Sequence, residues 1–357
     1  MAGYYINIKQ EKRKTAGVKA PDDISAICNK AGLTEFTMPV LPMQKGKIYI
    51  KLWLLFVCTA YWYKLKRTVK KGDYVVFQHP MYGVRISEKM IPAIQKKGVR
   101  FVAVIHDLET LRKGIANLSE YNQSRSEIGD TILLKHFDKV ICHNERMREY
   151  LLGNGFVDEQ LVNLDIFDYL TNYLPINRQK GNNPSIAIAG NLFSGKCKYI
   201  YDIPDVNTNL ELHLYGVNYD ETKQKSGMIY HGAYAPDELP AQLTGDFGLV
   251  WDGDTTKTCG GNTGEYLRYN NPHKTSLYLV AGMPVVVWSK AAMADFVLRN
   301  KVGITVDSLT DLDNKIAEIS TDEYVEMQLN AMKISEKLRQ GSFFLQALDK
   351  CIKGFIA

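Results

Sequence analysis

The chain has 357 residues, and this length predicts two domains of ordinary size. Hydrophobic residues make up 45% and charged residues 23%, which is typical of globular proteins with enough apolar material for two cores. The formal net charge is only +5, and no dense Lys/Arg module is present, which argues against nucleic acid as the main partner. The six cysteines are scattered without a C-x-x-C pair, so the pattern favours free thiols in a reducing cytosol over a zinc knuckle or a disulfide framework.

The first half of the chain alternates short β-type runs with helical stretches. It opens on a strand at 5–8 instead of a signal peptide, which favours a cytoplasmic location. Further strands are expected at 36–40, 74–78, 101–105, 139–142 and 162–164, and helices at 22–29, 50–66, 87–96, 123–136 and 145–153. Continuous apolar strands in a β-α-β-α order predict a doubly wound parallel sheet with helices on both faces.

The apolar run 52–62 lies between Lys51 and Lys64. A membrane-spanning helix needs roughly 20 apolar residues, and this run is shorter. We therefore expect a helix buried in the α/β domain. An alternative stays open, in which the helix presents its aromatic and lysine side chains to the inner face of an anionic membrane.

Two segments of the first half carry residue types suited to chemistry. Thr15 and Gly17 belong to a glycine-containing loop after the first strand, where a loop would face a ligand. His106 and Asp107 follow the strand at 101–105, and a general base is expected at such a carboxyl end. Each of these two side chains could instead cap a helix or hold a loop. Asp107 is the preferred candidate for taking a proton from an acceptor hydroxyl.

A stretch rich in Tyr, Asn, Pro and Gly at 168–184 is the candidate linker. It predicts domains at 1–170 and 171–357, with the final helix at about 342–357 as a candidate to pack back on the first domain. In the second half, strands are expected at 186–189, 210–214, 228–230, 247–251, 285–288 and 303–306, and three closing helices at 309–319, 321–338 and 342–355. Two doubly wound domains are expected to bind ligands in a cleft between the carboxyl ends of their sheets.

The segment 270–287 is the most informative part of the sequence. It predicts a loop, a helix that begins near Pro272 and ends at Gly282, and then a buried strand. The N-terminus of a helix exposes unpaired backbone N–H groups and the positive end of a dipole, which together attract phosphate. Lys274 lies in that first turn and adds a full positive charge. The segment therefore predicts a site for a phosphorylated ligand.

Several strand ends of the second half carry small or polar residues. Gly190 and Asn191 follow one strand, and Lys196 lies five residues beyond Asn191, so this turn either cradles a phosphate or simply enters a helix. It is not a P-loop, because Cys197 stands where Ser or Thr is required. Tyr215 ends the next strand.

Two further strand ends leave alternatives open. Tyr234 lies on a loop where an aromatic ring either stacks on a nucleobase or only packs against the protein. Asp252 and Asp254 could hold a divalent cation that bridges phosphates, or they could form an ordinary acidic turn.

These features together resemble a known family. The Gly-Asn-Leu turn at 190–192 and the pattern Asn-x-Pro-x-Lys-x-x-x-Tyr-Leu-x-x-Gly-x-Pro-Val at 270–285 resemble glycosyltransferases of the GT-B fold. The segments 105–112 and 137–147 are similar to bacterial galactofuranosyltransferases and to the glucosyltransferases that elongate glycans on serine-rich repeat adhesins. The resemblance implies two Rossmann-like domains and transfer of galactofuranose or glucose from a UDP-sugar to a glycan acceptor, either lipid-linked or protein-linked.

The resemblance also assigns roles to residues. Lys274 is expected to contact the diphosphate, and Lys196 to support the phosphates. Tyr234 is expected to face the base. The remaining residues expected on the donor are Thr15, Gly17, Gly190, Asn191, Tyr215, Asp252, Asn271, Thr275 and Tyr278. GT-B enzymes generally need no bound metal, so no metal and no cofactor besides the donor is expected. A homo-oligomer is plausible among such relatives.

One departure from the common GT-B pattern concerns the ribose. Many members carry a Glu in this segment, whereas Leu277 stands just before Tyr278 and no acidic residue is near. Two other functions stay open. A nucleotide-sugar epimerase would change the donor without an acceptor, and a noncatalytic partner protein would only bind it.

Overall fold

The computed structural model describes residues 1–8, 18–113 and 126–356. Its described residues divide into two compact units. Unit 1 comprises residues 1–8, 21–113, 126–164 and 344–356, and unit 2 comprises residues 18–20 and 165–343. The chain therefore passes from unit 1 to unit 2 at 164/165, six residues before the boundary expected from the linker composition.

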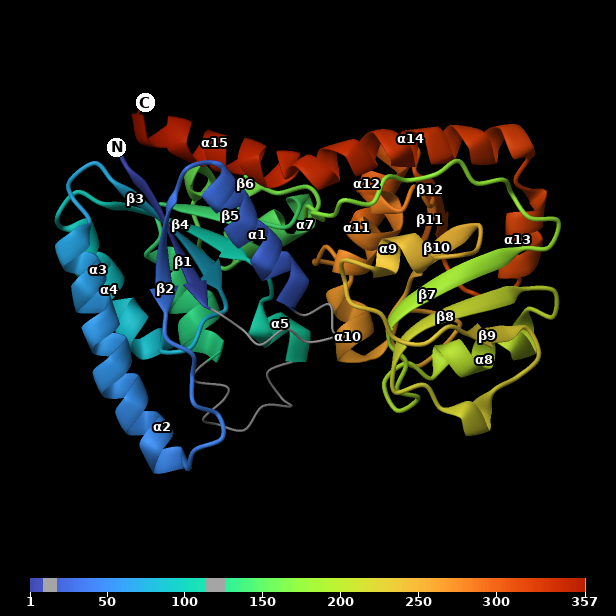
Figure 1. The fold of residues 1–357 in the computed structure, drawn as a ribbon, viewed down its shortest axis with the longest axis horizontal. Helices are drawn as coiled ribbons and strands as arrows, with labels where there is room; N and C mark the ends of the chain where they lie inside the picture. The colour runs from blue at the N-terminus through green and yellow to red at the C-terminus, as the bar shows by residue number, and fades with distance from the viewer. Residues whose placement is uncertain (9–17, 114–125, 357) are drawn as a thin grey trace. The chain divides into compact units, whose positions relative to one another are not determined.

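Unit 1 contains a six-stranded parallel sheet in the order β2-β1-β3-β4-β5-β6 (Figure 1). The strands are β1 (Gly3–Ile8), β2 (Thr34–Met38), β3 (Tyr74–His79), β4 (Arg100–Ile105), β5 (Lys139–Cys142) and β6 (Leu161–Asn163). The central strands β3 and β4 are buried along nearly their whole length. This confirms the expectation that continuous Val, Phe and Ile runs form strands covered on both faces.

The helices of unit 1 are largely where the sequence predicts them. They are α1 (Lys19–Lys30), α2 (Lys47–Trp53), η2 (Leu54–Cys58), α3 (Thr59–Thr68), α4 (Val84–Gln95), α5 (Glu109–Lys113), η4 (Ile128–Leu133), α7 (Glu145–Gly153) and η5 (Asp158–Gln160). The first residues of α1 belong to unit 2. Part of the helix expected at 123–136 lies outside the described residues, and its described part contains the π-helical turn η4.

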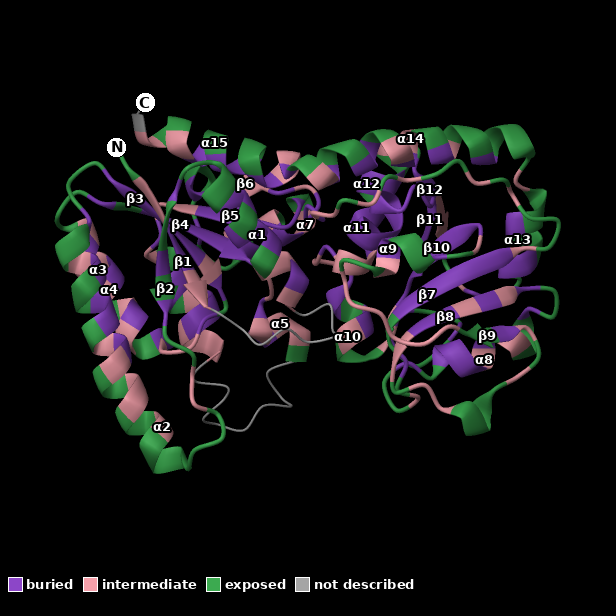
Figure 2. Ribbon diagram, viewed as in Figure 1, coloured by how far each residue is buried: buried purple, intermediate pink, exposed green. Residues whose placement is uncertain are grey.

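The helix expected at 50–66 is the continuous run α2-η2-α3, and its burial differs from the expectation. Cys58, Tyr61, Trp62 and Leu65 are buried, whereas α2 has no buried residue at all (Figure 2). The expectation of a buried helix therefore holds for one face of η2-α3 and is wrong for α2. The reason is that the apolar run surrounds the helix on all sides, and a helix at the surface of a domain can bury only one stripe.

Unit 2 contains a second six-stranded parallel sheet in the order β12-β11-β10-β7-β8-β9 (Figure 1). The strands are β7 (Ser185–Asn191), β8 (Glu211–Val217), β9 (Met228–Tyr230), β10 (Phe247–Val250), β11 (Val285–Trp288) and β12 (Gly303–Val306). Both faces of the sheet are buried: Ile186 and Ile188 pack into one hydrophobic core, and Ala187 and Ala189 pack into another. Alternate residues of one strand thus serve two cores, as in a doubly wound fold.

The helices of unit 2 connect these strands and close the chain. They are α8 (Tyr199–Val206), η6 (Glu221–Lys223), α9 (Leu239–Gln242), α10 (Gly261–Tyr266), α11 (His273–Val280), α12 (Met293–Asn300), α13 (Leu312–Glu318) and α14 (Thr321–Gln340). A capping box between Ser320 and Glu323 begins α14, and Gly341 ends it in the left-handed conformation. The last helix, α15 (Ser342–Ile356), belongs to unit 1 from Phe344 onward.

Candidate functional site

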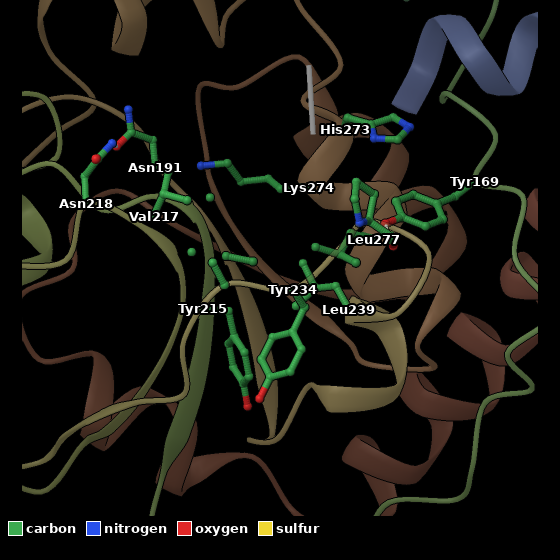
Figure 3. A pocket seen from close by; sticks show the side chains of 15 residues that line it. Tyr169, Asn191, Tyr215, Val217, Asn218, Tyr234, Leu239, His273, Lys274 and Leu277 are labelled. Carbon is green, nitrogen blue, oxygen red and sulfur yellow. Dashed lines mark hydrogen bonds between the residues drawn. The ribbon is translucent and has the colours of Figure 1, made fainter. Parts of the chain in front are cut away.

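A cavity of about 430 Å³ lies in unit 2 where the carboxyl ends of β7 and β8 meet the N-terminus of α11 (Figure 3). Ligands of open parallel sheets bind at this edge, because the loops after the strands leave room there. The cavity is lined by Tyr169, Ala189, Gly190, Asn191, Tyr215, Gly216, Val217, Asn218, Ala233, Tyr234, Pro236, Leu239, His273, Lys274 and Leu277. Five of the residues that the sequence predicts to bind a donor are among them.

Two glycines form the floor at the strand ends. Gly190 of β7 and Gly216 of β8 are partners in the parallel ladder, and both have positive φ angles of 141° and 147°. A Cβ on Gly216 would lie 1.7 Å from the carbonyl oxygen of Gly190, so no other residue fits there without a backbone shift. A Cβ on Gly190 would meet nothing within 4 Å. Open space over a backbone at a strand end lets a ligand approach that backbone closely.

Two asparagines extend this edge. The Asn218 side chain donates a hydrogen bond from Nδ2 to Oδ1 of Asn191, 3.0 Å away. The same oxygen accepts a hydrogen bond from the backbone N–H of Phe193 at 3.1 Å, so the orientation of the Asn191 carboxamide is set. Asn218 has a φ of 62°, a left-handed conformation that asparagine tolerates better than most residues. The two side chains give the cavity a polar rim.

The N-terminus of α11 supplies the positive charge. Pro272 precedes the first helical residue with extended backbone, and no side chain caps the helix. The Lys274 side chain extends toward the strand ends that carry Asn191 and Val217 (Figure 3), and its Nζ donates to the carbonyl oxygen of Trp251 at 3.0 Å. Burial lowers the pKa of His273 to about 4, so that ring is neutral at pH 7. Among the described residues that line the cavity, Lys274 is then the only charged side chain, and the cavity favours an anion.

Aromatic rings form the opposite side of the cavity. The rings of Tyr215 and His231 stack with centroids 4.6 Å apart, and the Tyr215 hydroxyl hydrogen-bonds the Thr244 hydroxyl at 2.7 Å. Tyr234 lies beside Tyr215, with ring centroids 6.4 Å apart (Figure 3). Burial lowers the pKa of His231, which favours the neutral ring. Tyr215 is itself only 1% exposed, so Tyr234, which is half-buried, is the ring that offers a flat, uncharged surface to a ligand.

Three residues of the predicted motif are buried and do not line the cavity. Asn271 donates from Nδ2 to the carbonyl oxygen of Asp165 at 3.1 Å, and the Thr275 side chain is inside the core. The Tyr278 hydroxyl accepts a hydrogen bond from the backbone N–H of Ala189 at 2.8 Å. These buried side chains fix the helix that carries Lys274 against the sheet and against the backbone at Asp165.

Two further predicted residues also lie outside the lining. Lys196 is exposed on the turn after β7, and Asp252 accepts a hydrogen bond from the backbone N–H of Gly253 at 2.9 Å. Both lie near Cys197. Burial raises the pKa of the Cys197 thiol, and the charges of Lys274, Asp252 and Lys196 have smaller effects on that pKa. No group of three or more His, Cys, Asp or Glu in the described residues could hold a metal ion.

His106 and Asp107 lie in unit 1 at the carboxyl end of β4. The His106 ring is hydrogen-bonded through Nε2 to Oε1 of Gln78 at 2.7 Å, and the Asp107 carboxylate lies 3.7 Å from Nε of Arg112. The Asp107 side chain is 36% exposed, which leaves it open to a substrate. Thr15 and Gly17 lie outside the described residues.

Several residues that line the cavity are not among those predicted from the sequence. Gly216, Val217 and Asn218 directly follow the predicted Tyr215. They could have been predicted, because ligands usually bind just beyond the carboxyl ends of the strands. Tyr169 has no such signal, because it lies in the stretch interpreted as a linker. Its ring stacks on His273 with centroids 5.0 Å apart, and its hydroxyl donates to the carbonyl oxygen of Pro236 at 2.5 Å.

Comparisons with known proteins decide the family. The N-terminal domain model of glucosyltransferase 3-like proteins matches residues 3–166, and the C-terminal domain model of the same proteins matches residues 186–351. The chain belongs to the glucosyltransferase 3-like family. Its resemblance to bacterial galactofuranosyltransferases and glucosyltransferases is thereby confirmed, and the chain is a glycosyltransferase.

Individual relatives of this glucosyltransferase 3-like chain are glycosyltransferases as well. It is 34% identical over 361 residues to the β-1,6-galactofuranosyltransferase WbbI of Escherichia coli K12. That alignment covers 98% of each chain. It is 26% identical to glucosyltransferase 3 of Streptococcus gordonii, over 79% of each chain. The solved structure of the lipopolysaccharide outer core galactosyltransferase WaaB superposes with a TM-score of 0.61 at 11% identity, covering 99% of both chains. The expected GT-B fold is confirmed.

No helix in the described ranges combines the length and the apolarity that crossing a bilayer requires.

Proposed function

We propose that this glucosyltransferase 3-like protein transfers a hexose from a UDP-sugar to a hydroxyl of a glycan acceptor. The observation that carries the proposal is the cavity in which Lys274 and the first turn of α11 face the glycine pair at the ends of β7 and β8. Its volume of about 430 Å³ falls in the range of small-molecule sites. Galactofuranose is the favoured sugar and glucose the second, because the galactofuranosyltransferase relative is more similar and matches more of the chain.

The proposed donor position follows from charge and shape. The diphosphate would lie against Lys274 and the free N–H groups of α11, where a cation and a helix dipole act together. The backbone at Gly190 would allow close approach, since no atom of a described residue lies within 4 Å of a Cβ built there. Tyr234 would contact the flat nucleobase, and the buried Tyr215 would support that side of the cavity from beneath.

The chemical step moves one electron pair away from the sugar. The bond between the anomeric carbon and the diphosphate oxygen breaks, and its electron pair stays on the departing diphosphate. The acceptor oxygen forms the new bond to the anomeric carbon and loses its proton, and we assign Asp107 as the base that takes it. Lys274 and the amides of α11 would stabilise the charge on the leaving group, so we propose that no metal cofactor is required.

We also propose that the protein works in the cytoplasm. The six cysteines are all buried free thiols, and free thiols persist in reducing compartments.

The test replaces Lys274. We expect Lys274→Ala to lower kcat for UDP release by about 10²- to 10³-fold, the usual cost of removing a group that stabilises developing charge. Lys274→Arg is the matched control, because it keeps the charge and should keep more activity. Release of UDP must depend on the acceptor, since acceptor-independent change of the donor would indicate an epimerase. Binding without any release would indicate a noncatalytic partner. Full activity of Lys274→Ala would refute the assignment of the site.

A further inference from the structure

The helix α2-η2-α3 in unit 1 exposes several large apolar side chains. Ile48, Leu52, Leu55 and Phe56 are at least half exposed. Their spacing of i, i+4, i+7 and i+8 places them on one face of the helix. Further exposed apolar side chains in the same segment are Val40, Met43, Tyr49 and Tyr63. We call Ile48, Leu52, Leu55 and Phe56 the apolar face.

The opposite side of the same helix is fixed to the core. Trp62 is fully buried, and its ring packs near those of Phe77 and Phe101 with centroids 6.4 Å away in both cases. The Tyr61 hydroxyl donates to the carbonyl oxygen of Phe36 at 2.9 Å. The helix therefore cannot rotate to bury the apolar face without exposing Trp62. Figure 2 shows this contrast, with exposed positions along α2 and buried ones along α3.

The segment is also strongly basic. Residues 36–72 contain eight Lys and Arg and no Asp or Glu, although the whole chain has a formal net charge of only +5. Subtracting eight from five leaves −3 for the rest of the chain. All eight side chains are at least partly exposed, and none of them forms an ion pair with another described residue. The eight are Lys45, Lys47, Lys51, Lys64, Lys66, Arg67, Lys70 and Lys71.

This combination selects one kind of partner. An exposed apolar helix face beside unpaired basic side chains matches the interfacial region of an anionic bilayer, where acyl chains accept the apolar groups and headgroups attract the cations. A second copy of the chain fits less well. A symmetric contact through this surface would bring two segments of charge +8 together, and like charges oppose association.

We propose that the apolar face and the nearby lysines at 45, 47 and 51 form a membrane-docking surface that binds anionic phospholipid at the bilayer interface. The helix would lie in the membrane plane, with Leu52, Leu55 and Phe56 among the acyl chains. Lys45, Lys47 and Lys51 would contact the headgroups. This proposal does not rest on the transfer reaction, because the surface lies outside the donor cavity and Asp107.

The experiment is co-sedimentation of the full-length protein with vesicles. One vesicle contains phosphatidylcholine alone, and the other contains equal parts of phosphatidylcholine and phosphatidylglycerol. We expect the protein to bind the anionic vesicles and to dissociate as salt is added. The double variant Leu52→Ser/Phe56→Ser and the triple variant Lys45→Gln/Lys47→Gln/Lys51→Gln should each lower the bound fraction about tenfold, because each removes one of two attractions that act together.

The matched control is Leu298→Ser/Leu329→Ser, which removes two leucines of unit 2 that are 57% and 50% exposed. It should bind like the wild type, and all variants should keep their activity on a water-soluble acceptor, which separates this proposal from the proposed function. Equal binding to both vesicles, no binding to either, or an equal loss in the control would overturn the proposal. So would a wild-type dimer in solution that Leu52→Ser/Phe56→Ser converts to a monomer, since the surface would then bind a second copy.

Discussion

The hydroxyl of Tyr278 accepts a hydrogen bond from the backbone N–H of Ala189, 2.8 Å away, and so joins helix α11 to the end of strand β7. The ring of the same tyrosine occupies the space above Gly248 of β10, where a Cβ would lie 2.1 Å from it. One side chain thereby fixes the helix that carries Lys274 relative to the strand that carries Gly190. The two sides of the donor cavity depend on this contact.

Removal of the Tyr278 hydroxyl tests that relationship. We expect Tyr278→Phe to lower the free energy of unfolding by about 1–3 kcal/mol, because the buried N–H of Ala189 loses its acceptor. The Michaelis constant for the donor should rise as well, since Lys274 and Gly190 lose their fixed spacing. Urea denaturation and steady-state kinetics measure both effects. Tyr63→Phe is the control, because Tyr63 is 52% exposed and should change neither quantity. An unchanged stability in Tyr278→Phe would mean that the contact contributes nothing.

The glycine pair gives a second prediction. We expect Gly216→Ala to weaken binding of UDP at least tenfold, because the added Cβ would lie 1.7 Å from the Gly190 carbonyl oxygen and must displace the strand ends. The φ of 147° adds a backbone cost of about 1–3 kcal/mol for alanine. Isothermal titration with UDP measures the affinity. Gly153→Ala serves as the control, since a Cβ there meets nothing within 4 Å. If Gly216→Ala binds UDP normally, the strand ends do not contact the donor.

The assignment of Asp107 gives a third prediction. We expect Asp107→Asn to lower kcat by about 10²- to 10⁴-fold, the range that general-base catalysis contributes, because the amide cannot accept the proton of the acceptor hydroxyl. Its affinity for UDP should stay unchanged, since Asp107 does not line the donor cavity. Single-turnover transfer and UDP titration separate the two effects. A variant with normal kcat would exclude Asp107 as the base.

Two histidines with lowered pKa values predict how stability depends on pH. Burial lowers the pKa of His143 and of His273 from 6.5 to about 4. Between pH 6.5 and pH 4 the unfolded chain binds protons that the folded chain does not, so the free energy of unfolding decreases as pH falls through this window. Above pH 7 these two groups should have no effect. Urea denaturation at pH 7.5 and pH 5 measures the change, and His273→Asn should reduce it. An unchanged slope in that variant would mean that His273 is protonated in the folded protein.

Much of this protein is predictable from local pattern. The strands at 139–142, 228–230, 285–288 and 303–306 have the predicted bounds, because short β-branched runs between turn residues leave few other conformations. The start of the helix that carries Lys274 is equally local, since Pro272 favours that position and the dipole of the helix follows from its backbone.

The composition of the cavity depended on contacts between distant parts of the chain. Gly190 and Gly216 are neighbours only because β7 and β8 pair in one particular register, and 25 residues separate the two glycines. Tyr169 lines the cavity from a segment whose composition resembles a linker, and Tyr278 faces the core although it belongs to the same motif as Lys274. The sheet beneath the helix at 47–68 also decides which face of that helix is buried. A sequence states which residues are apolar, but the sheet to which they pack determines which of them remain exposed.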